Sequence, residues 1–143
     1  MILPSSIRIT RGKKTLSELG IVAYANSKQY LFIIGEKNGN PATIHIYSLD
    51  KTSLYPRLKN IALIKLRGVR LTREIPDASR AYNPSKIWVD YEKCVEERCF
   101  KTVDLIHMIY VNQLDKDKYD ILFKLEDSGD ATVFKPLNIL NKI

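Results

Sequence analysis

The chain has 143 residues, 45% of them hydrophobic and 27% charged, a composition that supports an ordinary folded domain and excludes a disordered chain. No apolar run approaches the roughly 20 residues of a membrane-spanning helix, and the first residues lack the basic-then-apolar pattern of a secretory signal. The formal net charge of +7 is unevenly spread, because residues 1–92 carry 15 Lys and Arg against 7 Asp and Glu, whereas residues 93–143 carry 8 against 9. The first two-thirds of the chain therefore favour an anionic partner.

The N-terminal third alternates between basic loops and short apolar runs. Residues 1–15 form a basic arm with Gly12 as a breaker of regular structure. The first three predicted strands lie at residues 15–24, 29–35 and 42–49. The loop at residues 37–41 contains Asn-Gly, which predicts a tight hairpin between the second and third strands.

The middle of the chain contains its longest stretch without an acidic residue, from Lys51 to Arg73. Residues 51–59 are expected to hold a short helix that Pro56 interrupts. Residues 61–73 then alternate apolar and basic side chains, the period of a half-buried strand, and Gly68 marks a bulge where the phase slips. A fifth strand is predicted at residues 86–91 after a polar loop.

Five short strands with a helix between the third and fourth predict an all-β fold, a five-stranded OB-fold (oligonucleotide/oligosaccharide-binding) barrel, because closure removes exposed strand edges. The remaining residues add a C-terminal extension with strands in residues 100–111, 119–125 and 131–134. The expected organisation is thus a basic N-terminal arm at residues 1–15, a nucleic-acid-binding OB-fold domain at residues 16–92, and the extension at residues 93–143.

The sequence shows no constellation that would carry catalysis. Its six glycines are dispersed, so there is no phosphate-binding loop. Cys94 and Cys99 are expected to be reduced thiols, and His45 and His107 lie too far from them in sequence to suggest a zinc site. We therefore expect a protein that is not an enzyme, with no metal, cofactor or small-molecule substrate.

Four segments resemble the first OB-fold of telomere end-binding proteins, the family of the protection-of-telomeres protein and the alpha subunit of the ciliate end-binding complex. They read Gly-Ile-Val-Ala-Tyr at 20–24, Tyr-Leu-Phe-Ile-Ile-Gly-Glu at 30–36, Ile-His-Ile-Tyr-Ser at 44–48 and Ile-Lys-Leu-Arg-Gly-Val-Arg-Leu at 64–71. Residues 103–137, including the strand and turn at 121–129, resemble the opening of that family's second OB-fold. The resemblance implies binding of the single-stranded G-rich telomeric 3′ overhang, chromosome end protection in the nucleus, and contact with other telomere proteins through residues 93–143.

Single-strand binding needs cations along the phosphates and flat side chains on which bases stack. The predicted nucleic-acid-binding residues are Tyr24, Lys28, Tyr30, Tyr47, Lys65, Arg67, Arg70, Arg73, Arg80, Tyr82 and Lys86. By resemblance, Tyr24 and Tyr47 match base-stacking positions, and Arg67 and Arg70 match basic positions on the groove side of the fourth strand. Two alternatives stay open at this point: an OB-fold subunit for protein–protein interaction, and an RNA-binding OB protein.

Overall fold

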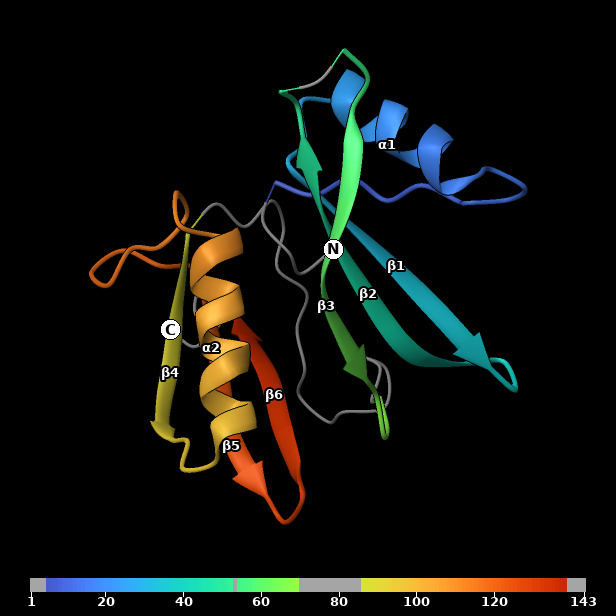
Figure 1. Ribbon diagram of the computed structural model, residues 1–143. Helices are drawn as coiled ribbons and strands as arrows, with labels where there is room; N and C mark the ends of the chain where they lie inside the picture. The colour runs from blue at the N-terminus through green and yellow to red at the C-terminus, as the bar shows by residue number, and fades with distance from the viewer. Residues whose placement is uncertain (1–4, 53, 70–85, 139–143) are drawn as a thin grey trace. The chain divides into compact units, whose positions relative to one another are not determined.

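The computed structural model describes residues 5–52, 54–69 and 86–138. The chain divides into two compact units, one formed by Ile9–Leu71 and the other by Met1–Arg8 together with Thr72–Ile143. Each unit contains one helix and one three-stranded sheet (Figure 1). We describe them in turn as the 9–71 unit and the C-terminal unit.

The 9–71 unit is a helix followed by an antiparallel meander. Helix α1 (Leu16–Ala25) precedes strands β1 (Tyr30–Lys37), β2 (Asn40–Asp50) and β3 (Arg57–Lys65), which lie in the order β1-β2-β3 (Figure 1). Asn38 and Gly39 connect β1 to β2 with φ angles of 55° and 80°. Positive φ at both central positions is what a two-residue hairpin turn with the strands' own twist requires, so the predicted Asn-Gly hairpin is confirmed.

Helix α1 begins at a capping box and ends against the sheet. The Thr15 hydroxyl accepts a hydrogen bond from the Glu18 backbone N–H, and the Glu18 carboxylate accepts one from the Thr15 N–H. These two bonds satisfy donors that a helix start otherwise leaves unpaired. Gly20 is buried, and a β-carbon there would lie 3.4 Å from the Leu58 side chain. The helix therefore lies close to the sheet at this point and is held at its first turn.

A bulge in β3 sends its basic side chains to both faces of the sheet. Ile46 pairs with Ala62, but the next residue of β2, Tyr47, pairs with Asn60, so Ile61 is the extra residue. Lys59 lies opposite Ser48 and Lys65 lies opposite Thr43. Because successive residues of a strand point to opposite faces, Ser48 and Thr43 are on different faces, and so are the two lysines. Lys59 lies outside residues 61–73, so the alternation expected in that segment stays a prediction, whereas its expected length is wrong in the described part because β3 ends at Lys65.

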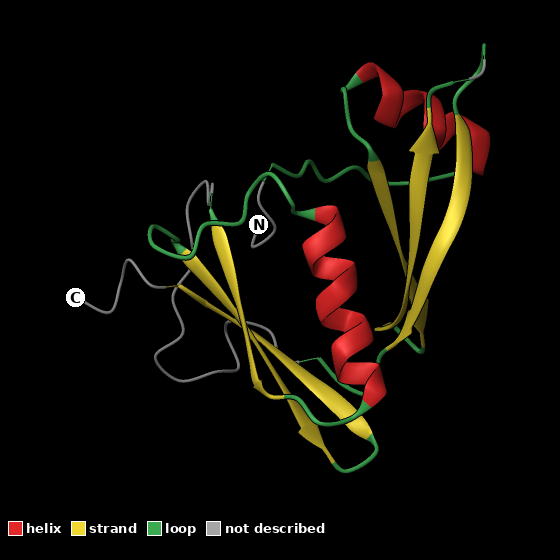
Figure 2. Ribbon diagram, turned by 60° about the vertical axis from the view of Figure 1, so that its left-hand side comes forward, coloured by secondary structure: helices red, strands yellow, loops and turns green. Residues whose placement is uncertain are grey.

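The C-terminal unit is built around a parallel crossover. Strand β4 (Ile87–Lys93) leads through helix α2 (Glu97–Ile109) to strand β5 (Ile121–Ser128), which pairs parallel to β4, and strand β6 (Ala131–Asn138) returns antiparallel to β5 (Figure 2). One face of α2 and the facing side chains of the sheet form the hydrophobic core. Its buried members are Ile87, Val89, Cys94, Cys99, Val103, Ile106, Tyr110, Ile121, Phe123 and Leu125.

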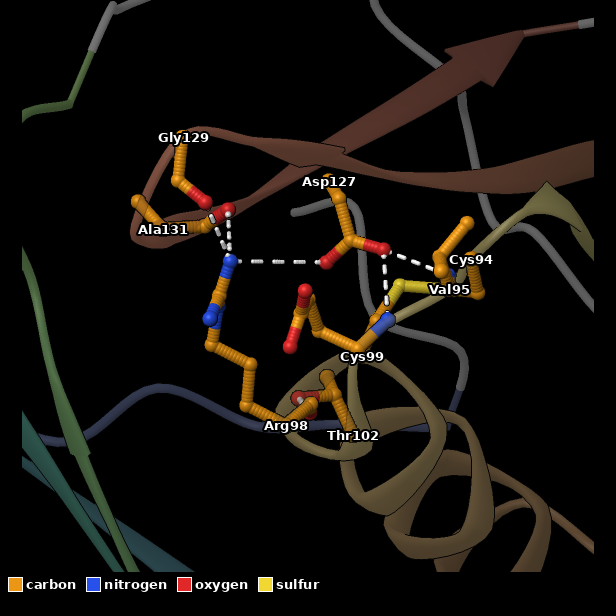
Figure 3. A network of polar contacts seen from close by, with 9 residues as sticks. Cys94, Val95, Arg98, Cys99, Thr102, Asp127, Gly129 and Ala131 are labelled. Carbon is orange, nitrogen blue, oxygen red and sulfur yellow. Dashed lines mark hydrogen bonds and ion pairs between the residues drawn. A yellow bond between two sulfur atoms is a disulfide. The ribbon is translucent and has the colours of Figure 1, made fainter.

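The start of α2 is fastened to the β5–β6 hairpin (Figure 3). One Asp127 oxygen accepts hydrogen bonds from the backbone N–H groups of Val95 and Glu96, the latter at 2.9 Å. The Arg98 guanidinium donates to the Gly129 carbonyl at 2.6 Å and lies 3.6 Å from the second Asp127 oxygen. A charged carboxylate at a helix N-terminus is favourable, so this contact fixes where α2 begins.

A disulfide between Cys94 and Cys99 closes the connection from β4 to α2. Both cysteines are buried in the core of the unit. The expectation of two reduced thiols is therefore wrong. The bond joins residues five apart in sequence, a local clip that a search for widely spaced cysteine frameworks does not detect.

The expected all-β, five-stranded OB-fold barrel is wrong. The described residues form two separate three-stranded sheets and two helices, an α+β arrangement without a closed barrel. Residues 16–25 are helix rather than strand, and the short helix expected in residues 51–59 gives way to β3, which starts at Arg57. A parallel β4–β5 pair also cannot belong to an antiparallel run of hairpins. The division into residues 1–15, 16–92 and 93–143 stays a prediction.

Candidate nucleic-acid interface

The net positive charge of the chain comes from the 9–71 unit. By sequence, residues 9–71 hold 11 Lys and Arg against 3 Asp and Glu, a net charge of +8. The rest of the chain holds 12 against 13, a net charge of −1. The charge asymmetry seen in the sequence therefore follows a structural division, which makes this unit the candidate surface for a polyanion.

The predicted site residues do not form one cluster. Four of them, Arg70, Arg73, Arg80 and Tyr82, lie outside the described residues. Lys86 belongs to the C-terminal unit, where its backbone N–H donates to the Asp120 carboxylate at 2.9 Å and its Nζ donates to the Asn112 carbonyl at 3.3 Å. Lys86 thus joins the start of β4 to the segment between α2 and β5, a structural role.

The remaining predicted residues are spread along the sheet of the 9–71 unit. Tyr24 and Lys28 lie at and just after the C-terminal end of α1. Lys65, at the opposite end of the sheet, pairs with Thr43, and Arg67 follows it. Seven residues of β2 separate the level of Thr43 from that of Asp50, a span of roughly 23 Å at about 3.3 Å per residue. Tyr24 and Lys65 therefore cannot contact the same nucleotide.

Tyr30 and Tyr47 are half-buried strand residues. Tyr30 begins β1 opposite Ser48, and Tyr47 lies in β2. The Tyr47 ring stacks on His45, with ring centroids 6.4 Å apart and planes at 21°. A ring that already has an aromatic neighbour and partial burial offers less surface to a base than an exposed one. Tyr24, whose side chain is 54% exposed, is the better placed aromatic residue.

A lysine lies against Tyr24, and further cations and a second ring lie along the same edge of the 9–71 unit. Lys51 Nζ lies over the Tyr24 ring, 5.7 Å from its centroid, within the range of a cation–π contact. The β1–β2 register that pairs Tyr30 with Ser48 continues through a hydrogen bond from the Leu49 N–H to the Gln29 carbonyl, so Lys28 reaches the level of Asp50. We give the name Tyr24 corner to the edge of the unit formed by α1 and the β2–β3 connection. It carries Tyr24, Lys28, Lys51, Tyr55 and Arg57, of which Lys51 lies over Tyr24 and Arg57 lies beside Leu16 and Ser17 at the start of α1.

One acidic residue, Asp50, lies beside this corner and is already engaged. Its carboxylate accepts hydrogen bonds from the Thr52 hydroxyl at 2.6 Å and the Thr52 N–H at 2.9 Å. These bonds, with a smaller contribution from Arg57, hold the pKa of Asp50 below its ordinary value. The corner therefore combines three cations with a single carboxylate that closes a local turn, and it retains a positive excess.

The sequence alone did not identify Lys51 and Arg57 as site residues. They flank the connection between β2 and β3, and Arg57 pairs with Asp50 across the two strands. Their neighbour Tyr24 is on a helix that was expected to be a strand. A correct helix prediction for residues 16–25 would have placed Tyr24 one turn after Gly20, but not beside Lys51.

Two further chemistries were searched for in the described part of the chain. No group of three or more His, Cys, Asp or Glu side chains there is arranged to hold a metal ion. No helix among those residues is long and apolar enough to cross a membrane.

No family model matches the chain, but the sequence is similar to archaeal proteins named probable Brix domain-containing ribosomal biogenesis protein. The relative from Saccharolobus solfataricus is 42% identical over 77 residues, covering 47% of this chain and 45% of the relative. The relative from Aeropyrum pernix is 32% identical over 72 residues, covering 50% of this chain and 38% of the relative. The chain spans less than half the length of these relatives.

A solved structure shares the fold. The crystal structure of a probable ribosomal biogenesis protein from Aeropyrum pernix K1 matches 96% of this chain and 76% of its own, with a TM-score of 0.73 and 20% sequence identity. At this identity the likeness concerns the fold. It extends over both units of the chain, including the parts that the sequence similarity leaves uncovered.

These comparisons overturn the resemblance to telomere end-binding proteins and what it implied. Single-stranded telomeric DNA, other telomere proteins and chromosome end protection are wrong, since the relatives are named for ribosome biogenesis. The expected nuclear and telomeric location is wrong on the same finding, because the relatives are archaeal and archaeal cells have no nucleus. The alternative of RNA binding agrees better with the relatives' names. The chain is similar in sequence and fold to proteins of ribosome biogenesis.

Proposed function

We propose that this chain takes part in ribosome assembly by binding ribosomal RNA or its precursor through the 9–71 unit. The observation that carries the proposal is the net charge of +8 on a unit of 63 residues, beside a C-terminal unit of −1. The names of the relatives supply the process, and the charge supplies the chemical class of partner. A basic unit of this kind neutralises phosphates and releases their counterions.

We also propose that the chain acts by binding and not by catalysis. In the described part of the chain, the pKa is lowered from the ordinary value at four carboxylates, Asp50, Asp115, Glu126 and Asp127. The largest cause in each case is a hydrogen bond to the ionised form. Such groups are poor proton donors at neutral pH, which is the opposite of the tuning that a general acid needs.

The binding proposal is tested by charge reversal in the full chain. A labelled ribosomal RNA fragment is titrated by fluorescence anisotropy at two salt concentrations with the wild type and with Lys59→Glu/Lys65→Glu. Because both lysines are exposed, neither substitution disturbs a hydrophobic core. They lie on opposite faces of β3, so the pair changes the charge of both faces of the sheet. The pair Lys116→Glu/Lys118→Glu, exposed in the C-terminal unit, is the matched control with the same change of charge.

We expect the variant of the 9–71 unit to lose at least tenfold in affinity. The slope of log affinity against log salt concentration should become shallower by about 0.7 for each phosphate contact removed. The control pair should bind within a few-fold of wild type. Equal weakening by both pairs would mean that the whole chain, and not one unit, meets the RNA. Absence of binding by the wild type at low salt would refute the proposal.

A further inference from the structure

We propose that the Tyr24 corner is a stacking site for unpaired RNA bases. The inference rests on the proposed function and narrows it, because it names single-stranded segments as the form of RNA that this surface recognises. The corner is carried by α1, by the end of β2, by the start of β3 and by the connection between these two strands. All five of its members belong to the 9–71 unit.

Tyr24 is presented to solvent by a helix that is held at two points. Tyr24 lies one helical turn after Gly20, whose close approach to Leu58 fixes α1 on the sheet. The capping box at Thr15 and Glu18 fixes the other end of the helix. A ring on a rigid element loses little entropy when a base stacks on it, which favours binding.

Large apolar side chains are exposed on both elements that form this edge of the unit, α1 and the β2–β3 connection. Tyr55 is 74% exposed and Leu54 is 92% exposed in the β2–β3 connection, and Ile21 on α1 is 55% exposed. Grouped apolar side chains on a soluble surface mark a contact site. Rings among them suit nucleobases, because every base has a flat face on which an aromatic side chain can stack.

The charges at the corner decide which kind of partner fits. Lys51 lies directly over the Tyr24 ring, and Lys28 and Arg57 are at the level of Asp50 on the neighbouring strands. Base-stacking rings bordered by cations are the arrangement that a single strand requires, since each base brings a phosphate with it. An apolar protein surface would instead have to desolvate these cations without pairing them.

Unpaired RNA fits this surface better than duplex RNA does. The bases of an A-form duplex are stacked on one another, and the duplex presents mainly phosphates and 2′-hydroxyl groups to a protein. An exposed ring at Tyr24 or Tyr55 finds no free base face to stack on in a duplex, so it adds no stacking free energy there. In a loop or single strand the bases can turn out and stack on the rings, at about 1–3 kcal/mol for each base.

The experiment compares two RNAs and two kinds of variant in the full chain. A labelled single strand and a hairpin duplex of related sequence are titrated by fluorescence anisotropy with wild type, Tyr24→Leu, Tyr24→Phe and Tyr55→Leu. Leucine keeps apolar area but removes the ring, whereas phenylalanine keeps the ring. Tyr91→Leu, a similarly exposed tyrosine of the C-terminal unit, is the control, and thermal melting confirms that each variant is folded.

We expect each leucine variant at the corner to lose about 5- to 100-fold in single-strand affinity, with an unchanged salt slope. Their duplex affinity should stay within twofold of wild type, and Tyr24→Phe and Tyr91→Leu should bind the single strand normally. RNA containing 5-iodouridine should crosslink to the tryptic peptide that holds Tyr24.

Two outcomes would overturn the inference, and they separate it from the proposed function. If wild type binds RNA but Tyr24→Leu and Tyr55→Leu bind the single strand as tightly as wild type does, the corner is a surface for another kind of partner, and only the inference fails. If both leucine variants weaken single strand and duplex equally, the rings do not read unpaired bases. If wild type binds neither RNA, the proposed function fails first.

Discussion

Replacing Gly20 by alanine tests how closely α1 lies against the sheet that carries the Tyr24 corner. A β-carbon at residue 20 would lie 3.4 and 3.5 Å from two carbons of Leu58 and 3.9 Å from one of Leu49, which is ordinary van der Waals contact. Alanine favours a helix interior over glycine by about 1 kcal/mol. Burying the added methyl group contributes up to about 0.8 kcal/mol, from which slight crowding subtracts. We expect Gly20→Ala to stabilise the chain by about 1 kcal/mol.

The assay is urea unfolding followed by circular dichroism, with Gly39→Ala as the control in the same unit. Gly39 has nothing within 4 Å of an added β-carbon, but its φ of +80° strains any L side chain, so alanine there should destabilise by about 1 kcal/mol. The same chemical change thus has opposite signs at two positions. Destabilisation by Gly20→Ala would mean that α1 lies closer to Leu58 than the structure has it, and the reasoning about a rigid Tyr24 would fail.

Three further predictions concern the C-terminal unit. Burial raises the pKa of Tyr110 to about 12, so the folded state holds this proton more tightly than the unfolded chain. The resulting stability is complete below about pH 10 and is reduced by about 1.4 kcal/mol at pH 11. In urea titrations, Tyr110→Phe should remove that part of the loss of stability at alkaline pH. An unchanged loss would mean that Tyr110 does not cause it. Reduction of the Cys94–Cys99 disulfide should cost about 2 kcal/mol for so short a loop, and Cys94→Ser/Cys99→Ser should make stability insensitive to dithiothreitol. Hydrogen bonds from the Glu96 and Val95 N–H groups lower the pKa of Asp127. The stability that this carboxylate contributes is therefore present above the ordinary aspartate pKa of about 3.9 and is lost as the pH falls below that value. Asp127→Ala should reduce the loss of stability at acid pH, and a loss as steep as in wild type would show that other groups cause it.

Elements that depend on neighbouring residues were predictable from the sequence. The Asn38-Gly39 hairpin and its two strands are confirmed, because a two-residue turn and its flanking alternation are both local signals. Strands were also correctly expected near β4, β5 and β6. The observed ends of these strands differ from the expected ends by up to four residues. Hydrogen bonding to a neighbouring strand decides where a strand ends, and the local sequence does not encode it.

The two helices were missed although the sequence contains their signals. Thr15 and Glu18 have the spacing of a capping box, and Cys99, Val103, Ile106 and Tyr110 recur at the spacing of one helical face. Apolar content in both segments was instead taken as strand. With residues 16–25 counted as a strand, five strands preceded residue 92, which resembled a barrel, and the α2 segment was assigned to a strand of the extension.

The candidate site was only partly predictable for a different reason. Tyr24 and Lys28 were expected as site residues, and they lie at and just after the end of α1. Lys51, which was not expected, lies over the Tyr24 ring although the two residues are far apart in sequence. No local pattern encodes that proximity.

The pairing of strands implies an order of folding for the two units. In the 9–71 unit each strand pairs with its neighbour in the chain, as in Tyr30 with Ser48, so little loop entropy is lost before contacts form. In the C-terminal unit Ile87 must find Ile121, 34 residues away and beyond a whole helix, before the parallel pair exists. We therefore expect the basic unit to form first during synthesis, so that the proposed RNA-binding surface is complete while the second sheet is still being assembled.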